Sequence, residues 1–156
     1  MTIHLWVENW DWFDPADPST LTYAVDKAFE YLDENIEIAN INEKPAVLEE
    51  FGIARDYGSY DPNSSTDIRD LYYSYIFDYI TGHVEDGNSN IVGANFWAYA
   101  GHGRPTKVGG DWEPGDELIG DPPFEKQGWY SVYNNDTTIG VIALYADILN
   151  DFSNQI

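Results

Sequence analysis

Apolar residues recur at helical spacing in three separate segments of the chain. In each segment, positions three and four apart form one apolar stripe, which is typical of an amphipathic helix packed on a core. We therefore predict helices over residues 21–36, 68–80 and 141–152, each after a Ser, Thr or Asp that can cap its first turn. The stripes comprise Leu21, Ala24, Val25, Ala28, Phe29, Leu32 and Ile36; Ile68, Leu71, Tyr72, Tyr75, Ile76, Tyr79 and Ile80; and Val141, Ile142, Tyr145, Ile148, Leu149 and Phe152.

A short strand-like run precedes each predicted helix, at residues 2–7, 46–52 and 90–99. Alternation of strands and helices predicts an α/β fold with parallel strands and right-handed crossovers, here as a single domain over residues 1–156. The segments that follow the strands are long, and the last, over residues 100–135, is rich in Gly, Pro, Asp and Trp. Because sites in such folds form at the carboxyl ends of the strands, we expect these loops to carry the function.

Strict alternation along a strand predicts which side chains share a face of the sheet. In the second strand it groups Glu50 with Ala46 and Leu48, and it leaves Glu49 at the rim, where we predict an ion pair with Arg55. The faces expected to pack under helices hold Ile3, Leu5 and Val7, then Val47 and Phe51, then Val92, Ala94 and Phe96. The opposite faces predict a site that contains His4, Trp6, Glu8, Glu50, Asn95 and Trp97.

Composition narrows the range of partners. The 156 residues include 28 acidic side chains against seven Lys and Arg, for a formal net charge of −21. This field repels nucleic acid and anionic membranes but not a neutral substrate, so we predict neither nucleic acid nor membrane as a partner. The chain has no Cys, which excludes disulfides and thiolate zinc sites. No apolar run approaches the ~20 residues of a membrane span, and the first ten residues lack the pattern of a signal peptide.

The acidic loop "GGDWEPGDELIGDPP" raises the question of calcium. It lacks the spacing of carboxylates and glycine that known calcium loops share. We therefore expect a solvated loop there, and neither a metal nor another cofactor.

Four segments together resemble a known family: "MTIHLWVENWDWFDP", "KPAVLEEFGIARD", "NIVGANFWAYAGHGRP" and "GDPPFEKQGWYSVYNND". They occur in the same order in the C-terminal part of glycoside hydrolase family 5 endo-β-1,4-mannanases, and the match is closest to bacterial members. The resemblance implies a partial (β/α)8 TIM barrel, with the three units as strands and helices six to eight. A full barrel takes ~250 residues, so we expect the first five units to be absent from this chain.

The resemblance also implies roles for the residues at the strand ends. Glu50, directly before Phe-Gly, matches the family's nucleophile, and His4 matches the histidine that supports the nucleophile. Trp97 matches the tryptophan that forms the floor of the sugar site. Trp6 stands where the family commonly has Tyr, whose hydroxyl touches the nucleophile, so a stacking or shape role is expected for it. The alternatives are a solvated glutamate, a structural histidine and ordinary core tryptophans.

Several loop residues are further candidates for substrate contact. Tryptophans at one end of a sheet suit a polysaccharide cleft, because their flat rings pack on the C–H faces of sugars. For each of them alone, packing is an equal alternative. Arg104 is a candidate because it follows the third strand. The loop aromatic candidates are Trp10, Trp12, Trp112, Trp129 and Tyr130.

A retaining glycosidase needs a second carboxyl, which the family supplies as a glutamate after an asparagine at the end of strand four. The Asn42-Glu43 pair precedes a strand, at the wrong end for barrel chemistry, and Glu8 does not match the motif. We therefore predict that this chain carries the nucleophile without the acid/base, and that activity needs the N-terminal remainder of the barrel.

Three functions remain open from sequence. The first is a retaining endo-β-mannanase acting on mannan, glucomannan or galactomannan, which the resemblance would place outside the cell or in the periplasm. The second is a β-1,4-glucanase of the same family. The third is a non-catalytic carbohydrate-binding protein that uses the loop tryptophans.

Overall fold

Three parallel strands and three long helices alternate along the chain, as the sequence predicts. The computed structural model describes residues 1–87 and 89–153, without the side chains of residues 152 and 153. The sheet has the order β1-β2-β3. Its strands are β1 (Thr2–Leu5), β2 (Ala46–Phe51) and β3 (Ile91–Ala94), and the helices are α1 (Leu21–Ile41), α2 (Asp67–Asp86) and α3 (Thr138–Ser153).

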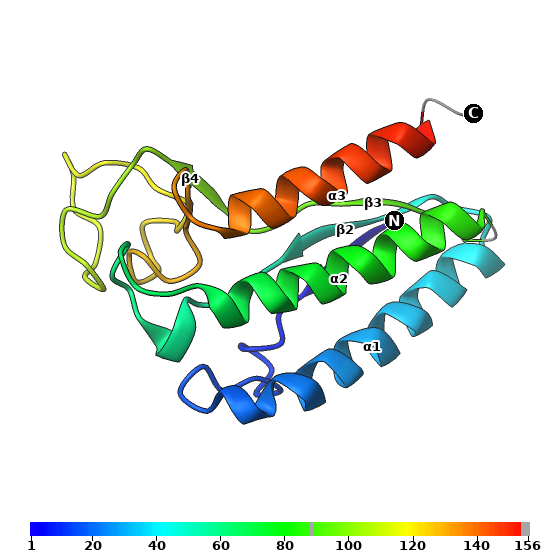
Figure 1. The fold of residues 1–156 in the computed structure, drawn as a ribbon, viewed down its shortest axis with the longest axis horizontal. Coiled ribbons are helices and arrows are strands. Elements are labelled where there is room, and N and C mark those ends of the chain that lie inside the picture. The colour runs from blue at the N-terminus through cyan, green and yellow to red at the C-terminus, as the bar shows by residue number, and fades with distance from the viewer. Residues whose placement is uncertain (88, 154–156) are drawn as a thin grey trace.

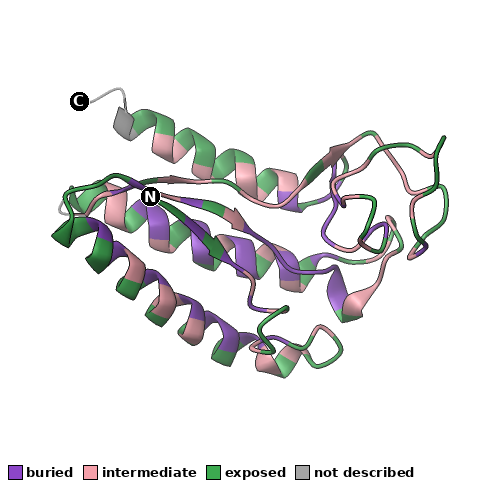
Figure 2. Ribbon diagram, turned by 180° about the vertical axis from the view of Figure 1, so that it is seen from behind, coloured by how far each residue is buried: buried purple, intermediate pink, exposed green. Residues whose placement is uncertain are grey.

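The helices cover one face of the sheet. Helix α2 lies between α1 and α3 (Figure 1), and the view from behind shows the strands in front of the helices (Figure 2). The loops that follow the strands gather at one end of the molecule, while the termini of the described chain lie towards the other. Two short 3-10 helices, Pro18–Thr20 and Asp56–Gly58, interrupt the first two of these loops. None of the described helices is long and apolar enough to cross a membrane.

The third strand is shorter than the predicted range of 90–99. It ends at Ala94, but the chain continues along β2 through hydrogen bonds from Asn95 N–H to the Leu48 carbonyl (2.8 Å) and from Trp97 N–H to the Phe51 carbonyl (2.8 Å). After a cis peptide bond between Trp97 and Ala98, β4 (Tyr99–Gly101) pairs in parallel with β5 (Val132–Tyr133). The predicted strand is therefore divided between two sheets.

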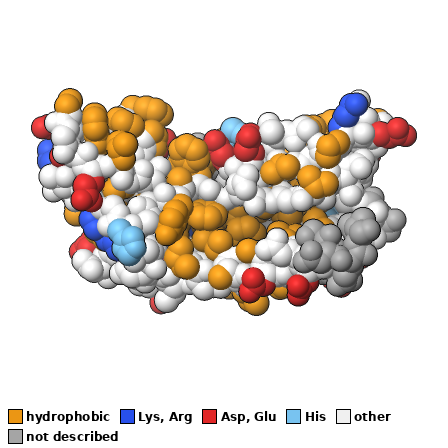
Figure 3. Space-filling model, turned by 90° about the horizontal axis from the view of Figure 1, so that it is seen from above, with side chains coloured by type: hydrophobic (Ala, Val, Ile, Leu, Met, Phe, Trp, Pro, Cys, Tyr) orange, Lys and Arg blue, Asp and Glu red, His pale blue; other side chains and the backbone are white. Residues whose placement is uncertain are grey.

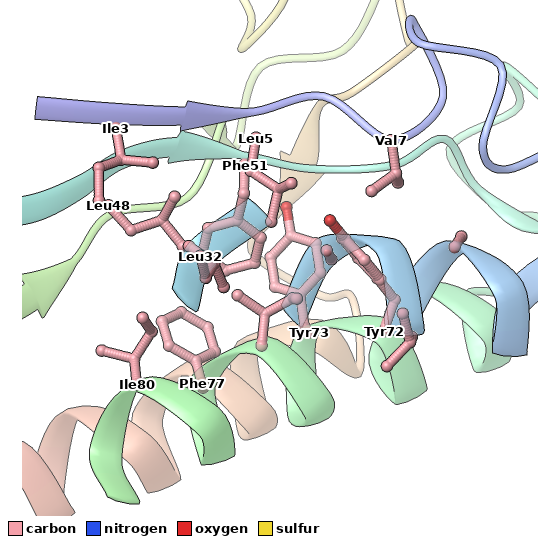
Figure 4. Packing of buried hydrophobic residues seen from close by; sticks show 14 of the residues in the cluster. Ile3, Leu5, Val7, Leu32, Leu48, Phe51, Tyr72, Tyr73, Phe77 and Ile80 are labelled. Atoms are coloured by element: carbon pink, nitrogen blue, oxygen red, sulfur yellow. The ribbon is translucent and has the colours of Figure 1, made fainter. Parts of the chain in front are cut away.

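The main core lies between the sheet and helices α1 and α2. Figure 4 shows Leu5 and Phe51 pointing from the strands towards Leu32 of α1 and Tyr73 of α2. These four side chains are fully buried. Burying one such large apolar side chain contributes roughly 1.5–3 kcal/mol, so this layer supplies much of the folding free energy.

The apolar stripes of the helices are confirmed unequally. Helix α1 buries Leu21, Ala24, Val25, Ala28, Leu32 and Ile36 as predicted. In α2 the predicted members Leu71 and Tyr75 are 42% and 43% exposed, whereas Tyr73 and Phe77 are buried. The predicted members Tyr72, Ile76 and Ile80 are buried, so the stripe is confirmed in part. The buried face is wider than predicted and is displaced towards Tyr73 and Phe77, because α2 has a helix on each side.

Helix α3 remains only partly covered. Its predicted stripe residues Val141, Ile142, Tyr145, Ile148 and Leu149 are half-buried, and the side chain of Phe152 lies outside the described residues. An apolar cavity of about 460 Å³ opens between β3 and α3, and hydrophobic side chains gather on this side of the molecule (Figure 3).

One extra residue in β2 changes the faces that strict alternation predicts. Ile3 pairs with Leu48, but the next residue of β1, His4, pairs with Glu50, so Glu49 is a bulge. As a result Phe51 joins Leu48 on the buried face, and Glu50 lies opposite His4 on the other face. The grouping of Glu50 with Ala46 and Leu48 was therefore wrong, but the prediction that Glu50 and His4 share a face is confirmed.

A second register shift explains the exposure of Val92. Ala46 pairs with Ile91 and Val47 with Gly93, which leaves Val92 as the extra residue of β3. Its side chain is 58% exposed, so its predicted place under the helices was wrong.

Two buried arginines share one carboxylate behind the loops. Arg55 donates to both oxygens of Asp136, at 2.8 and 3.0 Å, and Arg69 donates to Asp136 Oδ2 at 2.6 Å. Arg55 and Arg69 are 2% and 0% exposed. The predicted pair of Glu49 with Arg55 is therefore wrong, because the Arg55 guanidinium is directed into this cluster, which joins the loop after β2, helix α2 and the start of α3.

Close packing at Gly52 joins β2 to the segment after β3. A Cβ atom on Gly52 would lie 2.5 Å from the Trp97 carbonyl oxygen, which also accepts a hydrogen bond from the Tyr73 hydroxyl at 3.2 Å. Only glycine allows the backbone to approach this closely.

We expect Asp136→Asn to lower the free energy of unfolding by about 3–5 kcal/mol, because it leaves two buried guanidinium groups without an anion. Urea unfolding followed by circular dichroism measures the change. Asp147→Asn, on the exposed surface of α3, is the matched control and should change stability by less than about 0.5 kcal/mol. Equal effects of the two substitutions would contradict a structural role for the cluster.

The same cluster predicts a pH dependence. Burial alone would raise the pKa of Asp136, but the hydrogen bonds from Arg55 and from Tyr133 N–H, with the charges of Arg69 and Arg55, outweigh it and hold the pKa below its usual value. The stabilisation is therefore present above the pKa of the unfolded chain and is lost as the pH falls towards the folded-state pKa. The difference in free energy of unfolding between wild type and Asp136→Asn, measured by urea unfolding at a series of pH values, should therefore become smaller below about pH 4.

We expect Gly52→Ala to destabilise the fold by about 1–3 kcal/mol, because the new methyl group overlaps the Trp97 carbonyl. Gly82→Ala is the control, since among the described residues a Cβ built there meets nothing within 4 Å apart from its own stretch of helix backbone. In the interior of helix α2 that substitution should stabilise the protein by roughly 0.5–1 kcal/mol. Thermal and urea unfolding distinguish the two, and a neutral Gly52→Ala would show that the segment moves freely.

Candidate active site

A cavity of about 370 Å³ opens at the carboxyl ends of the strands. Each of the three strands contributes residues to it from its own end or from the loop that follows, and residues 122–130 of the long loop close it. Its lining consists of Trp6, Asn9, Glu50, Trp97, Pro122, Phe124, Glu125 and Tyr130. Four residues predicted for the site or for substrate contact are thus brought together in one pocket: Trp6, Glu50, Trp97 and Tyr130.

The carboxylate of Glu50 lies beside the imidazole of His4. His4 Nδ1 is 3.1 Å from Glu50 Oε2, and His4 Nε2 is hydrogen-bonded to Glu49 Oε2 at 3.1 Å. The bulge places the two consecutive glutamates on either side of this one ring. A neutral imidazole has one donor nitrogen, so only the imidazolium donates to both carboxylates at once. The Glu50 side chain is 25% exposed, towards the pocket, and is therefore accessible to a ligand.

Aromatic rings form one wall of the pocket. Trp6 meets Trp97 edge to face, with ring centroids 6.3 Å apart, and lies 5.2 Å from the Tyr130 ring. Such a wall offers flat apolar surface beside the Glu50 carboxylate. This combination suits a ligand that has both C–H faces and hydroxyl groups.

Glu125 is a pocket residue that sequence reasoning missed. Its Oε2 is buried and has no hydrogen-bond partner among the described residues. Burial raises the pKa of its carboxyl, and the charges of Asp121 and Glu50 raise it further. Position 125 follows no periodic pattern, and the signal that could have found it was its place in the segment "GDPPFEKQGWYSVYNND".

Two acidic side chains hold the long loop over the pocket. The buried Asp121 accepts hydrogen bonds from Gly128 N–H (2.8 Å), Tyr130 N–H (2.6 Å) and the Ser131 hydroxyl (2.6 Å). Glu8 accepts from Ala54 N–H at 2.9 Å and from the Trp129 indole N–H at 2.7 Å. Burial raises the pKa of Glu8, although both hydrogen bonds oppose this.

Trp129 lies behind the pocket wall. Its ring stacks on Tyr130, with centroids 4.8 Å apart, and its indole N–H is engaged by Glu8. It is not among the residues that line the cavity.

The remaining predicted substrate residues lie outside the pocket lining. Trp10 and Trp12 pack on each other and on Tyr31 of helix α1. Trp112 has a buried indole nitrogen without a hydrogen-bond partner among the described residues.

Arg104 also lies outside the lining and is engaged elsewhere. Its guanidinium stacks over the Tyr133 ring at 4.4 Å. It also donates to the carbonyls of Gly101 and Gly103 and to the side chains of Asn134 and Asn135. These contacts join the strand β4 to the turn that follows β5.

Metal ligands are not gathered in the described part of the chain. Within residues 1–87 and 89–153, no group of three or more His, Cys, Asp or Glu side chains could hold a metal ion.

Comparison with known proteins identifies the family. The model of the GH family 5 beta-mannosidase-like family matches residues 1–154. A search of curated proteins found no match.

Solved structures agree with this assignment. The glycoside hydrolase family 5 mannosidase from Rhizomucor miehei is 38% identical with a TM-score of 0.89, over 99% of this chain and 38% of that one. A variant of the same enzyme in complex with mannosyl-fructose is 39% identical, with the same coverage and TM-score. The endo-beta-1,4-mannanase from Thermotoga petrophila, at 24% identity and a TM-score of 0.53 over 96% of this chain and 26% of its own length, shows the fold alone.

These matches confirm the predicted fold class, because the three βα units correspond to part of a glycoside hydrolase (β/α)8 barrel. The chain spans about 38% of the length of the mannosidase that it matches. The chain belongs to the β-mannosidase-like members of glycoside hydrolase family 5.

Proposed function

We propose that this chain is the nucleophile-bearing part of a retaining glycoside hydrolase that cleaves β-1,4-mannosidic bonds. The observation that carries the proposal is the position of Glu50, at the carboxyl end of β2, in one pocket with Trp6 and Trp97. Carboxyl ends of parallel strands are where barrel enzymes perform their chemistry. The mannosyl-fructose complex of the Rhizomucor miehei enzyme supports a mannoside as the sugar.

In the proposed reaction, a Glu50 oxygen attacks the anomeric carbon of a mannosyl unit and the glycosidic bond breaks. The leaving oxygen takes a proton from a second carboxyl group, and a covalent glycosyl-enzyme remains. Water, deprotonated by the same second group, then releases the sugar and frees Glu50. His4 orients the nucleophile from 3.1 Å away, and Trp97 supports the sugar ring.

We propose that the second carboxyl lies outside residues 1–156, so that the isolated chain is inactive. Its three units would be the last three of a (β/α)8 domain, with the remainder of the barrel as an obligatory partner. Glu43, the candidate from the Asn42-Glu43 pair, is exposed at the amino end of β2 and remote in the fold from Glu50. We also propose an extracellular or periplasmic location, on the basis of the family resemblance alone.

Two modes of attack on a mannan chain are compatible with this chemistry. An endo-acting enzyme, which the family resemblance favours, needs a cleft that is open on both sides of the nucleophile. A specific observation favours the second mode, release of terminal units. Pro122, Phe124 and Glu125 line the Glu50 pocket, with Phe124 86% exposed, and would restrict the cleft on one side.

We expect Glu50→Gln to lower kcat on β-mannosides by at least ~10³-fold, because an amide oxygen is a poor nucleophile at the anomeric carbon. The measurement is reducing-sugar release by the complete protein that contains residues 1–156, with mannan and cellulose as parallel substrates. Glu43→Gln is the matched control and should keep activity within about twofold.

Each contrary outcome identifies a different function. Cleavage of cellulose in preference to mannan would indicate a β-1,4-glucanase. Retardation in a glucomannan gel without any sugar release would indicate a carbohydrate-binding protein. Turnover by the isolated 156-residue chain that vanishes in Glu50→Gln would show that an acid/base lies within it.

The endo-acting mode predicts a mixture of mannooligosaccharides early in the digestion of mannohexaose, because internal bonds are cut at random. Terminal release predicts mannose as the first product. Chromatography of the earliest products, at less than a tenth of complete conversion, separates the two. Phe124→Gly should broaden the product range if the loop over residues 122–125 restricts the cleft.

A further inference from the structure

The carboxylate of Glu8 joins three segments that are far apart in the sequence. Its Oε2 accepts from the backbone N–H of Ala54, in the loop after β2, at 2.9 Å. Its Oε1 accepts from the Trp129 indole N–H, in the long loop before β5, at 2.7 Å. Both oxygens are therefore used as acceptors, and both donors are N–H groups.

The next residue extends this connection into the pocket. Asn9 Oδ1 accepts a hydrogen bond from the Tyr130 hydroxyl at 2.6 Å. Trp129 and Tyr130 are stacked, with ring planes only 13° apart. Tyr130 in turn lies 5.2 Å from Trp6 and lines the cavity that holds Glu50. Glu8 is thus connected to one aromatic wall of the pocket through Trp129.

We propose that Glu8 is a positioning residue for sugar binding, acting through Trp129 to hold Tyr130 against the pocket. This inference rests on the proposed function. Glu8 does not line the cavity, so it acts on the substrate only through the two rings. A glutamine cannot replace Glu8. The single carbonyl oxygen of glutamine accepts from one of the two N–H groups, of Ala54 or of Trp129, and its amide NH2 group then faces the other N–H.

This role predicts an effect on substrate affinity rather than on bond cleavage. Tyr130 forms a wall of the pocket, while the attack involves Glu50 and His4. Displacing Tyr130 should therefore raise KM and leave kcat nearly unchanged, whereas loss of the nucleophile lowers kcat.

The test is a double-mutant cycle of Glu8→Gln and Trp129→Phe, assayed on a β-mannoside in the complete protein that contains this chain. Trp129→Phe keeps an aromatic ring on Tyr130 but removes the N–H donor. We expect each single variant to raise KM about tenfold with kcat within twofold, and the double variant to be no worse than either. Glu34→Gln, on the exposed face of α1, is the control and should leave both constants unchanged.

A second readout does not need turnover. The indole N–H resonance of Trp129, assigned by its absence in Trp129→Phe, should move upfield in Glu8→Gln because a charged acceptor is lost. An unmoved resonance would overturn the proposal. If Glu8→Gln does not fold, Trp129→Phe carries the test, and a KM equal to that of wild type overturns the proposal.

The outcomes separate this proposal from the proposed function. If wild type cleaves β-mannosides and Glu8→Gln has the KM of Glu34→Gln, the role of Glu8 is wrong and the function stands. If wild type cleaves none but binds mannobiose, as seen by tryptophan fluorescence, weaker binding by Glu8→Gln supports the positioning role while the hydrolytic function fails. If wild type neither cleaves nor binds, both fail.

Discussion

The site depends on one extra residue in the middle of β2. Without the bulge at Glu49, Glu50 would share a face with Leu48, which is buried against the helices. An ionised carboxylate there would be costly, and Phe51 would be displaced from the core to the opposite face. The bulged pairing of Glu49 therefore allows both the core and the pocket to have the side chains they need. It also explains why two consecutive glutamates both reach the same histidine.

The loops over the pocket are held mainly by carboxylates, because the chain has many more acidic side chains than Lys and Arg. Only seven Lys and Arg are present, and two of them are buried on the single carboxylate of Asp136. Arg104 and the Lys126–Asp111 ion pair hold other parts of the loops, and carboxylates that accept from neutral N–H and O–H groups, such as Asp121 and Glu8, hold the segment over the pocket. Hydrogen bonds to a charged acceptor are about twice as strong as neutral ones, so an acidic chain can order long loops with few ion pairs.

The order of strands and helices could be predicted because hydrophobic periodicity is a local property, and α1 illustrates this, since six of the seven residues predicted for its stripe are buried and the seventh, Phe29, is half-buried. The bulges at Glu49 and Val92 could not be predicted, since they depend on the pairing between strands. Each bulge changes the face of the sheet on which the following side chains lie, and the amino-acid composition does not reveal it. The meeting of Glu50, Trp6 and Trp97 followed from the strand ends and the family motifs. The presence of Glu125 in the pocket lining and the absence of Trp129 from it could not be predicted. Both depend on the path of a long loop, on which periodicity gives no information.

The pair of carboxylates in the pocket has a further physical consequence. Glu50 and Glu125 line one cavity. Burial raises the pKa of Glu125, and the negative charges of Asp121 and Glu50 raise it further. A carboxyl with a raised pKa keeps its proton to higher pH, so it can donate a hydrogen bond as well as accept one. A sugar hydroxyl offers both a donor and an acceptor, and it matches such a group in either protonation state. An anionic ligand would instead meet the Glu50 carboxylate in a chain of net charge −21, so electrostatics disfavours anionic ligands in this pocket.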